Sequence, residues 1–498
     1  MNKKSAYRKL EEISKKTAYF SAALSLVFWD QRTYMPPEGY KYRGELISTV
    51  REYVHSVWTS DEVGRLIEEA GREDLDQVEK MNLFWWRRSY EKNKKIPRDL
   101  LVELSKLATE TIEVWKRARR EANFELVKPY LKRIVDLLRR KAEAIGYEEE
   151  PYDALLDDFE PNLTARFVER IFKPLEEETR RLLDRVKGVD FGDEILHRHF
   201  PKEKQVEFNH YLLQEIGYDF NRGRLDETVH PFAVRILPRD IRITTRYYED
   251  YLPSGLFGTL HEAGHALYNM NLPEEYFGLP VGRPSSLSLH ESQSRFWENV
   301  VGRSLAFWQV YMDMAKHYFD ALRDVSVEQF YRAINAMKPS TIRVEADELT
   351  YNLHIILRFR LERALINGQM EVDEVRDAWN ETFRELFGFY PPNDREGILQ
   401  DIHWYSGSMG YFPTYALGNL ISAQLYFKMN EELGDLQEII ARKGFDEILG
   451  WLRDKIHRYG SLYMPMDLVK MATGKDLGYE DFVRYIEQKI STLTSTLV

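Results

Sequence analysis

The sequence predicts a mainly α-helical protein with one small β-sheet, and three observations support this fold class. Apolar residues recur at helical spacing over four long stretches, which are residues 110–146, 162–188, 340–368 and 414–434. Strand-like alternation is confined to residues 229–251. No internal repeat, low-complexity segment or Gly/Ser-rich linker divides the chain. We therefore expect a single large, bilobed helical domain over residues 1–498, with a small antiparallel sheet around residues 229–251.

Local signals mark the ends of the predicted helices. Pro129 interrupts the first stretch because proline cannot donate a backbone hydrogen bond inside a helix, and Gly146 ends it. Asn162 is the expected N-cap of the second stretch and Thr414 that of the fourth. The apolar run at residues 18–29 has 12 residues and is too short to span a bilayer. We interpret it as a buried helix rather than a signal peptide.

The predicted sheet has one clearly patterned strand. Ile241, Ile243 and Thr245 alternate with Arg242 and Thr244, which is typical of a half-buried antiparallel strand. This segment lies directly before the most informative helix of the sequence. We therefore expect the sheet to lie near the functional site.

The net charge and the amino-acid composition indicate which kinds of partner and which cell compartment to expect. The net charge is −11 and the pI near 5.7, whereas nucleic acids and anionic membranes attract basic surfaces. The sequence has no cysteine, which excludes disulfides, a thiolate nucleophile and cysteine-ligated zinc. We expect a cytoplasmic protein with no nucleic-acid or membrane partner. The content of charged residues, 30%, leans towards a thermostable protein.

The stretch TLHEAGHALYNMN, residues 259–271, predicts a metal-binding helix. His261 and His265 are four residues apart, so they project from the same helix face. Glu262 beside the first histidine is a candidate general base, as in helical H-E-x-x-H zinc sites. Gly264 leaves room for something bulky against the helix backbone.

A catalytic zinc site needs a third protein ligand and one open position. The same helix offers no third histidine after His265, which excludes a metzincin-like site. Glu274 and Glu275 follow too closely to fold back over the histidines. Glu291 lies 26 residues after His265, at the start of a new helix behind a Gly- and Pro-containing loop. We therefore predict Glu291 as the third ligand.

Several motifs together resemble one known family, the carboxypeptidase Taq-type metallocarboxypeptidases of the glutamate-zincin superfamily. The segments HEAGH at residues 261–265 and HESQ at residues 290–293 carry the resemblance. The other motifs stand in the family's order: WDQRTYMP at 29–36, HPF at 230–232, DIRIT at 240–244, IRVEAD at 342–347 and GILQDIHW at 397–404. The resemblance covers most of the chain.

The resemblance implies a helical fold with a deep active-site groove, lined by the small sheet, in a thermostable homodimer. It also implies removal of single C-terminal residues from peptides with broad preference and poor action on C-terminal proline. One position departs from the wider superfamily, where an acidic residue often follows the glutamate ligand by four positions and orients a histidine. Here that position is Arg295, so the sequence does not identify the partner of the zinc histidines.

The expected cofactor is one Zn²⁺ per chain, although a His-His-Glu site also accepts Co²⁺ or Mn²⁺. The metal would activate a water molecule, and Glu262 would accept its proton and pass it to the leaving amine. His403 and Tyr415 are candidates to stabilise the oxyanion. Tyr405 and Tyr411 are equally well placed by sequence alone.

A carboxypeptidase must bind a free carboxylate, which arginine does best through its bidentate fork. Arg343 is the candidate because of the IRVEAD resemblance, and Asp347 at i+4 on the same predicted helix would hold its guanidinium. Spacing alone favours an ordinary surface ion pair instead. Arg242 is the alternative carboxylate ligand, and His230 is expected to line the substrate groove.

Two alternatives to a zinc carboxypeptidase stay open from the sequence. A groove-restricted zinc endo-oligopeptidase would share every metal residue but would not need Arg343. A non-catalytic helical scaffold with a structural metal would have four protein ligands and no use for Glu262.

Overall fold

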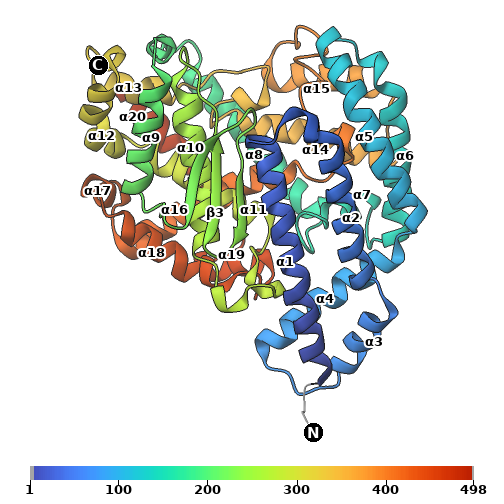
Figure 1. The fold of residues 1–498 in the computed structure, drawn as a ribbon. Coiled ribbons are helices and arrows are strands. Elements are labelled where there is room, and N and C mark those ends of the chain that lie inside the picture. Colours follow the sequence, from blue (N-terminus) through green and yellow to red (C-terminus); the bar gives the residue numbers. More distant parts are fainter. Residues whose placement is uncertain (1–4, 496–498) are drawn as a thin grey trace. The chain divides into compact units, whose positions relative to one another are not determined.

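The computed structural model describes residues 5–495 and is mainly helical, as the sequence predicts (Figure 1). The chain folds into two compact units, each assembled from segments that are far apart in the sequence. The first unit contains the chain up to Asn93, Gly192–Ile334 and Ile421–Leu477. The second contains Lys94–Phe191, Asn335–Leu420 and the chain from Gly478.

The first unit contains the sheet and the predicted metal helix. Its helices are α1 (Ser5–Thr33), α2 (Tyr40–Trp58), α3 (Asp61–Ala70), α4 (Gln77–Lys95), α9 (Lys202–Glu215), α10 (Leu252–Met270), α11 (Leu287–Arg295), α12 (Leu305–Tyr318), α13 (Val327–Ile334), α17 (Leu436–Ala441), α18 (Phe445–Lys455) and α19 (Pro465–Thr473). A π-helical segment, Phe296–Val301, continues α11. The strands are β1 (Gly223–Glu227), β2 (Ala233–Leu237) and β3 (Asp240–Thr245).

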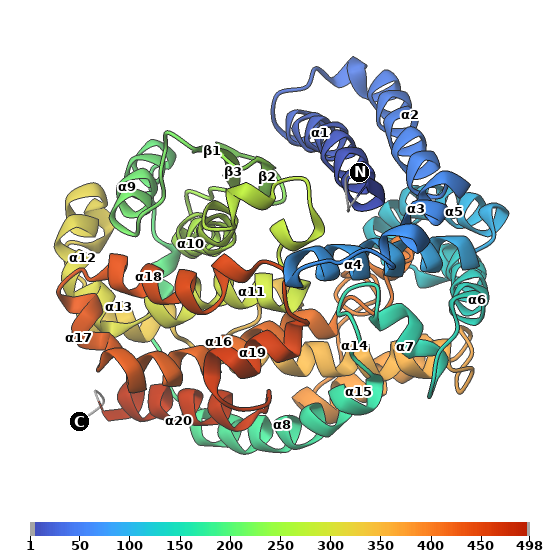
Figure 2. The same ribbon diagram turned by 90° about the horizontal axis from the view of Figure 1, so that it is seen from below.

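The second unit is built around one buried helix, α14 (Tyr351–Ile366). Helices α6 (Lys128–Ile145), α7 (Pro151–Leu156), α8 (Ala165–Val186) and α15 (Val375–Phe387) pack against α14, and α20 (Glu480–Ser495) packs along α8 (Figure 2). Helix α5 (Arg98–Glu121) also belongs to this unit. Helix α16 (Pro413–Leu433) begins in this unit and ends in the first.

The sheet is mixed rather than antiparallel, which corrects the prediction. The strand order is β1-β3-β2; β3 runs antiparallel to β2 and parallel to β1. A tight turn joins β2 to β3, so β3 has to run back along β2, and β1 adds to its free edge. The sequence GRLDE of β1 carries two acidic residues and an arginine, so its composition gave no strand signal.

Helix α10 lies directly against this sheet, contacting β3 and β2 (Figure 2). Ile241 and Ile243 of the central strand are completely buried, as their alternation predicts. Burial of each such side chain contributes roughly 1.5–3 kcal/mol. The sheet therefore gives the metal helix a fixed apolar support.

Several predicted helix boundaries are wrong. Helix α14 begins at Tyr351 rather than near residue 340, because Asp347 accepts hydrogen bonds from the backbone N–H groups of Leu349 and Thr350. That side chain supplies the acceptors that a continuing helix would otherwise supply, so the helix starts after it.

Two predicted N-caps also differ. Thr164, not Asn162, caps α8, and its hydroxyl accepts from the N–H of Phe167. Thr414 lies inside α16, which begins one residue earlier at Pro413. By contrast, Gly146 ends α6 as predicted, and Pro129 lies in the first turn of α6, where its missing N–H costs little.

The apolar run at residues 18–29 is helical, within α1, but the prediction that it is buried is wrong for much of its surface. Tyr19 is 61% exposed and Leu26 41% exposed, whereas Ala22 and Trp29 are buried. The run is apolar on most of its surface, with Ser21 and Ser25 as its small polar residues, so its sequence gives little information on which face packs. Across the described residues, no helix has both the length and the apolarity needed to cross a bilayer.

Candidate functional site

Helix α10 presents His261 and His265 on one face, as their four-residue spacing requires. Glu262 is 7% exposed and Gly264 is also buried in this helix. Pro253 stands in the first turn of α10, where its fixed φ favours helix initiation. The helix therefore begins well before the histidines, which lie in its regular interior.

Gly264 allows α11 to approach the histidine face of α10. A Cβ atom at this position would lie 2.4 Å from the carbonyl oxygen of Gln293 and 2.6 Å from the Cα of Ser294. The bulky group expected against Gly264 is thus the backbone of α11 itself. Because α11 comes so close, Glu291 on that helix reaches the two histidines.

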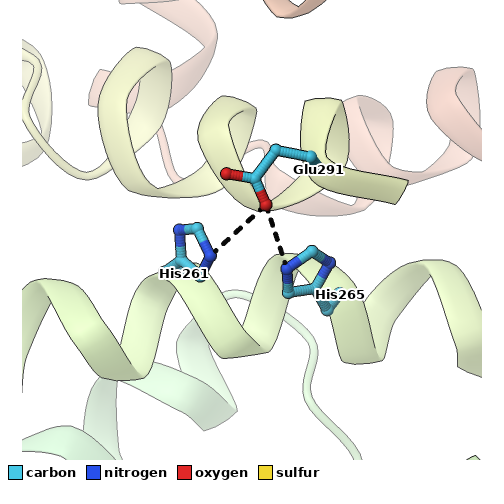
Figure 3. A group of neighbouring side chains, drawn as sticks. All are labelled: His261, His265 and Glu291. Atoms are coloured by element: carbon cyan, nitrogen blue, oxygen red, sulfur yellow. Dashed lines mark ion pairs between the residues drawn. The ribbon is translucent and has the colours of Figure 1, made fainter. Parts of the chain in front are cut away.

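The three predicted ligand atoms converge (Figure 3). The Oε2 atom of Glu291 lies 3.6 Å from Nε2 of His261 and 3.4 Å from Nε2 of His265. Bonds of about 2.0–2.1 Å to a tetrahedral zinc ion would place neighbouring ligand atoms roughly 3.3–3.4 Å apart. His261, His265 and Glu291 therefore fit a divalent metal ion with little rearrangement.

Glu298 supplies the histidine partner that the sequence did not identify. Its Oε2 atom lies 2.8 Å from Nδ1 of His261. A proton on Nδ1 shared with this carboxylate leaves the Nε2 lone pair free for a metal. Arg295, which stands where the wider superfamily often has an acidic residue, donates from Nε to Oε1 of Glu291 at 2.7 Å, which leaves Oε2 facing the histidines.

The charges in this cluster keep the carboxylates around His261 ionised. Burial alone would lower the pKa of His261, but the carboxylates of Glu291 and Glu298 outweigh it and raise that pKa to about 8. Burial opposes ionisation of Glu298, yet His261 and Arg295 bring its pKa to about 2. Burial raises the pKa of Glu262, which suits a group that must accept a proton near neutral pH.

Arg343 lies in the second unit, in the single 3-10 turn Arg343–Glu345 rather than on a helix. The predicted i,i+4 pair with Asp347 is therefore wrong. Its Nε and Nη2 atoms donate instead to Asp401, with Nη2 2.7 Å from Oδ1, and its Nη1 donates to the Tyr351 hydroxyl at 2.7 Å. Arg343 is only 6% exposed, so the other interpretation from the sequence, an ordinary surface ion pair, is also wrong.

His403 and Tyr415 meet in the same unit. The Tyr415 hydroxyl lies 3.4 Å from Nε2 of His403, and the guanidinium of Arg343 lies 5.0 Å from the centre of the Tyr415 ring. Burial lowers the pKa of His403 to about 4, so its ring is neutral at pH 7. Tyr405 is completely buried and donates to the carbonyl of Ile398. This geometry favours Tyr415 over Tyr405 for contact with a substrate.

The remaining predicted residues lie around the sheet. His230 is exposed in the segment between β1 and β2. Arg242 on β3 donates from Nε and Nη2 to Asp240 at 2.7 and 2.8 Å, and its guanidinium stacks 4.3 Å from the ring centre of Trp29. One bidentate edge of Arg242 is thus already occupied.

Comparison with known proteins identifies the same family as the motifs. The sequence model of the carboxypeptidase Taq (M32) metallopeptidase family matches residues 9–490. Thermostable carboxypeptidase 1 of Thermus thermophilus is 42% identical and covers 99% of this chain and 100% of its own length. Carboxypeptidase 1 of Bacillus subtilis is 40% identical over 97% of each chain. A solved structure of Pyrococcus furiosus carboxypeptidase has a TM-score of 0.94 at 36% identity and covers 98% of this chain and 99% of that one.

Proposed function

Because the chain belongs to the carboxypeptidase Taq (M32) family of metallopeptidases, we propose that it is a zinc-dependent carboxypeptidase that releases single C-terminal residues with broad specificity. The observation that carries the proposal is the convergence of one carboxylate oxygen and two imidazole nitrogens at 3.4–3.6 Å. Co²⁺ is a possible substitute, since the donor set does not select zinc alone.

A zinc ion bound by His261, His265 and Glu291 would supply Lewis acidity and lower the pKa of water in its open position. Glu262 is the proposed general base, because its carboxyl group follows the first histidine and its raised pKa favours proton uptake. It then returns the proton to the leaving amine. Glu298 keeps His261 in the required tautomer and orientation.

We propose that Arg343 binds the C-terminal carboxylate of the substrate. Asp401 occupies its Nε/Nη2 edge and orients the guanidinium. His403 and Tyr415 are proposed to stabilise the oxyanion as neutral hydrogen-bond donors. His230 and Arg242 remain proposed substrate contacts, with Arg242 second to Arg343 because Asp240 occupies its fork.

A homodimer, thermostability and a cytoplasmic location stay predictions that rest on the family resemblance and on composition. So does the absence of nucleic-acid and membrane partners. Each is checked by an ordinary measurement on the purified protein or the cell, and the proposed chemistry depends on none of them.

The proposal is tested by two substitutions assayed on one unblocked peptide. Glu262→Gln keeps the size of the side chain but cannot accept a proton, so kcat should fall at least about 1,000-fold while bound zinc stays at one ion per chain. Arg343→Met should raise KM strongly and kcat less. Retained hydrolysis in Glu262→Gln would remove the general base, and an unchanged KM in Arg343→Met would favour the endo-oligopeptidase.

A further inference from the structure

Two buried arginines share one carboxylate in the second unit. Asp401 accepts hydrogen bonds from Arg343, and it accepts one more from Nε of Arg358 on α14, whose guanidinium pairs with it as an ion pair. The Arg358 Nε lies 2.7 Å from Oδ2 of Asp401, and its Nη2 lies 2.6 Å from the same oxygen. The side chain of Arg358 is completely buried and that of Asp401 is 11% exposed.

The hydrogen-bond inventory of the two arginines differs. Arg358 also donates from Nη1 to the carbonyl of His354, while its Nη2 is buried and has no hydrogen-bond partner among the described residues, so no part of its guanidinium faces solvent. Arg343 has five N–H donors, of which the described chain uses one on Nε, one on Nη2 and one on Nη1. The described residues thus use one of the two donors on each Nη, which leaves one donor on each Nη for a further carboxylate.

The charges in this cluster do not cancel. One Asp401 carboxylate faces two guanidinium groups, so the hydrogen-bonded trio carries one net positive charge. Burial lowers the pKa values of His354 and His403, which are therefore neutral at pH 7. Glu362 also interacts with Arg358; because burial raises its pKa to about 7, it offsets only about half a charge at pH 7. Its oxygens accept from Tyr152, Trp404 and Gly410.

A simple Arg343–Asp401 pair would have no net charge and little attraction for an anion. Asp401 is nevertheless needed, because it holds the guanidinium in one orientation. A second cation resolves this conflict, since it neutralises Asp401 from the other side and leaves the charge of Arg343 uncompensated. Burial of the whole trio strengthens that effect because water screens it little.

We propose that Arg358 is the residue that sets the selectivity of this site for a free carboxylate, acting through Asp401. It does not touch the substrate, so it is a positioning residue. The inference rests on the proposed function, in which Arg343 binds the C-terminal carboxylate. It assigns to the deeply buried Arg358 the role of keeping that site cationic.

The test compares binding of 3-phenylpropionate with binding of its uncharged analogue 3-phenylpropanol. Both are measured as competitive inhibitors of the holoenzyme, and the ratio of the two inhibition constants isolates the effect of charge. Arg358→Met should weaken carboxylate binding about tenfold or more and leave alcohol binding within about twofold. Arg360→Met is the matched control, because Arg360 lies on the same helix but pairs with Glu176 and Glu385.

The double variant Arg358→Met/Asp401→Asn restores one net charge and should bind the carboxylate more tightly than Arg358→Met. Arg358→Lys keeps the charge without the fork and should retain the selectivity ratio within about threefold, which keeps the test decisive if Arg358→Met does not fold. A ratio in Arg358→Met equal to that in Arg360→Met would overturn the inference. So would a double variant no better than the single one, or a loss of selectivity in Arg358→Lys.

The same assay distinguishes failure of the proposed function from failure of the inference about Arg358. If Arg343→Met leaves the ratio unchanged, Arg343 is not the carboxylate ligand and the proposal beneath this inference is wrong. If Arg343→Met destroys selectivity while Arg358→Met preserves it, Arg343 keeps its role and the inference about Arg358 alone is refuted.

Discussion

The substitution Gly264→Ala tests how the proposed metal ligands are brought together. The new Cβ would lie 2.4 Å from the carbonyl oxygen of Gln293, whereas a real Cβ atom essentially never lies closer than 3.0 Å to such a neighbour. The nearest atoms belong to the backbone of α11 and not to a side chain that could rotate away. Helix α11 must therefore move away from α10 by about 0.6 Å or more.

That displacement can be compared with what a metal site tolerates. Ligand distances in such sites hold to about 0.2 Å, so the shift is roughly three times the tolerance. It moves Glu291 away from His261 and His265, which now face its Oε2 at 3.6 and 3.4 Å. We expect zinc affinity to fall at least about 100-fold, and overpacking to cost roughly 1–3 kcal/mol of unfolding free energy, partly offset by the better helix propensity of alanine.

The assay is a zinc titration in competition with a chromophoric chelator, together with thermal unfolding of the metal-free protein. Gly258→Ala is the matched control, because it also lies on α10 but its Cβ would meet the Thr245 hydroxyl at an ordinary 3.4 Å. That control should bind zinc as the wild type does. Wild-type zinc affinity in Gly264→Ala would refute the conclusion that the close approach at Gly264 positions Glu291.

Two further predictions concern the same cluster. Glu298→Gln keeps a hydrogen-bond acceptor for His261 but removes the charge, so zinc affinity should fall about tenfold or more. The metal-free protein should also unfold at a lower temperature at pH 7, because the lowered pKa of Glu298 means that its charge stabilises the fold. An unchanged zinc affinity would show that Glu298 does not support the site. Zinc binding must displace the proton that His261 carries below its metal-free pKa of about 8. Affinity should therefore be level above about pH 9 and fall roughly fivefold between pH 8 and 7, while the number of protons released per zinc rises from about half towards one; a flat profile across that interval would contradict the raised pKa.

The convergence of the proposed metal ligands could be predicted because local rules determine most of their placement. Two histidines four residues apart share a helix face whatever the rest of the fold does. Glu291 could be chosen because a loop with glycines and prolines allows the next helix to return. Glu298 could not be chosen from the superfamily pattern, which places the acidic partner four residues after the glutamate ligand, whereas seven residues, two helical turns, also return to the same face.

The surroundings of Arg343 could not be predicted in the same way. Its partner Asp401 is 58 residues away in the sequence, so the pair depends on tertiary packing and leaves no trace in local periodicity. The expected pair with Asp347 assumed a helix that the Asp347 side chain itself delays. Arg358 did leave a signal, since an arginine inside the apolar run of α14 needs a buried anionic partner.

The exposed surface of α1 shows a third feature that the sequence could not predict, the extent of burial of a helix. The largely apolar run of α1 at residues 18–29 is helical, but the fraction of it that becomes buried depends on which elements pack against it. The mixed sheet has the same origin, because strand direction follows from pairing partners rather than from composition.

The most direct test of the central claim is mass spectrometry of one unblocked peptide and of its C-terminal amide, each incubated with the enzyme before and after chelation. If the enzyme is a metallocarboxypeptidase, this measurement should show a ladder of products shortened one residue at a time from the free C-terminus. It should also show no ladder from the amide, none after chelation, and recovery when Zn²⁺ is restored. Internal cleavage of both peptides would contradict the role of Arg343, and undiminished cleavage after complete removal of the metal would contradict the role of His261, His265 and Glu291.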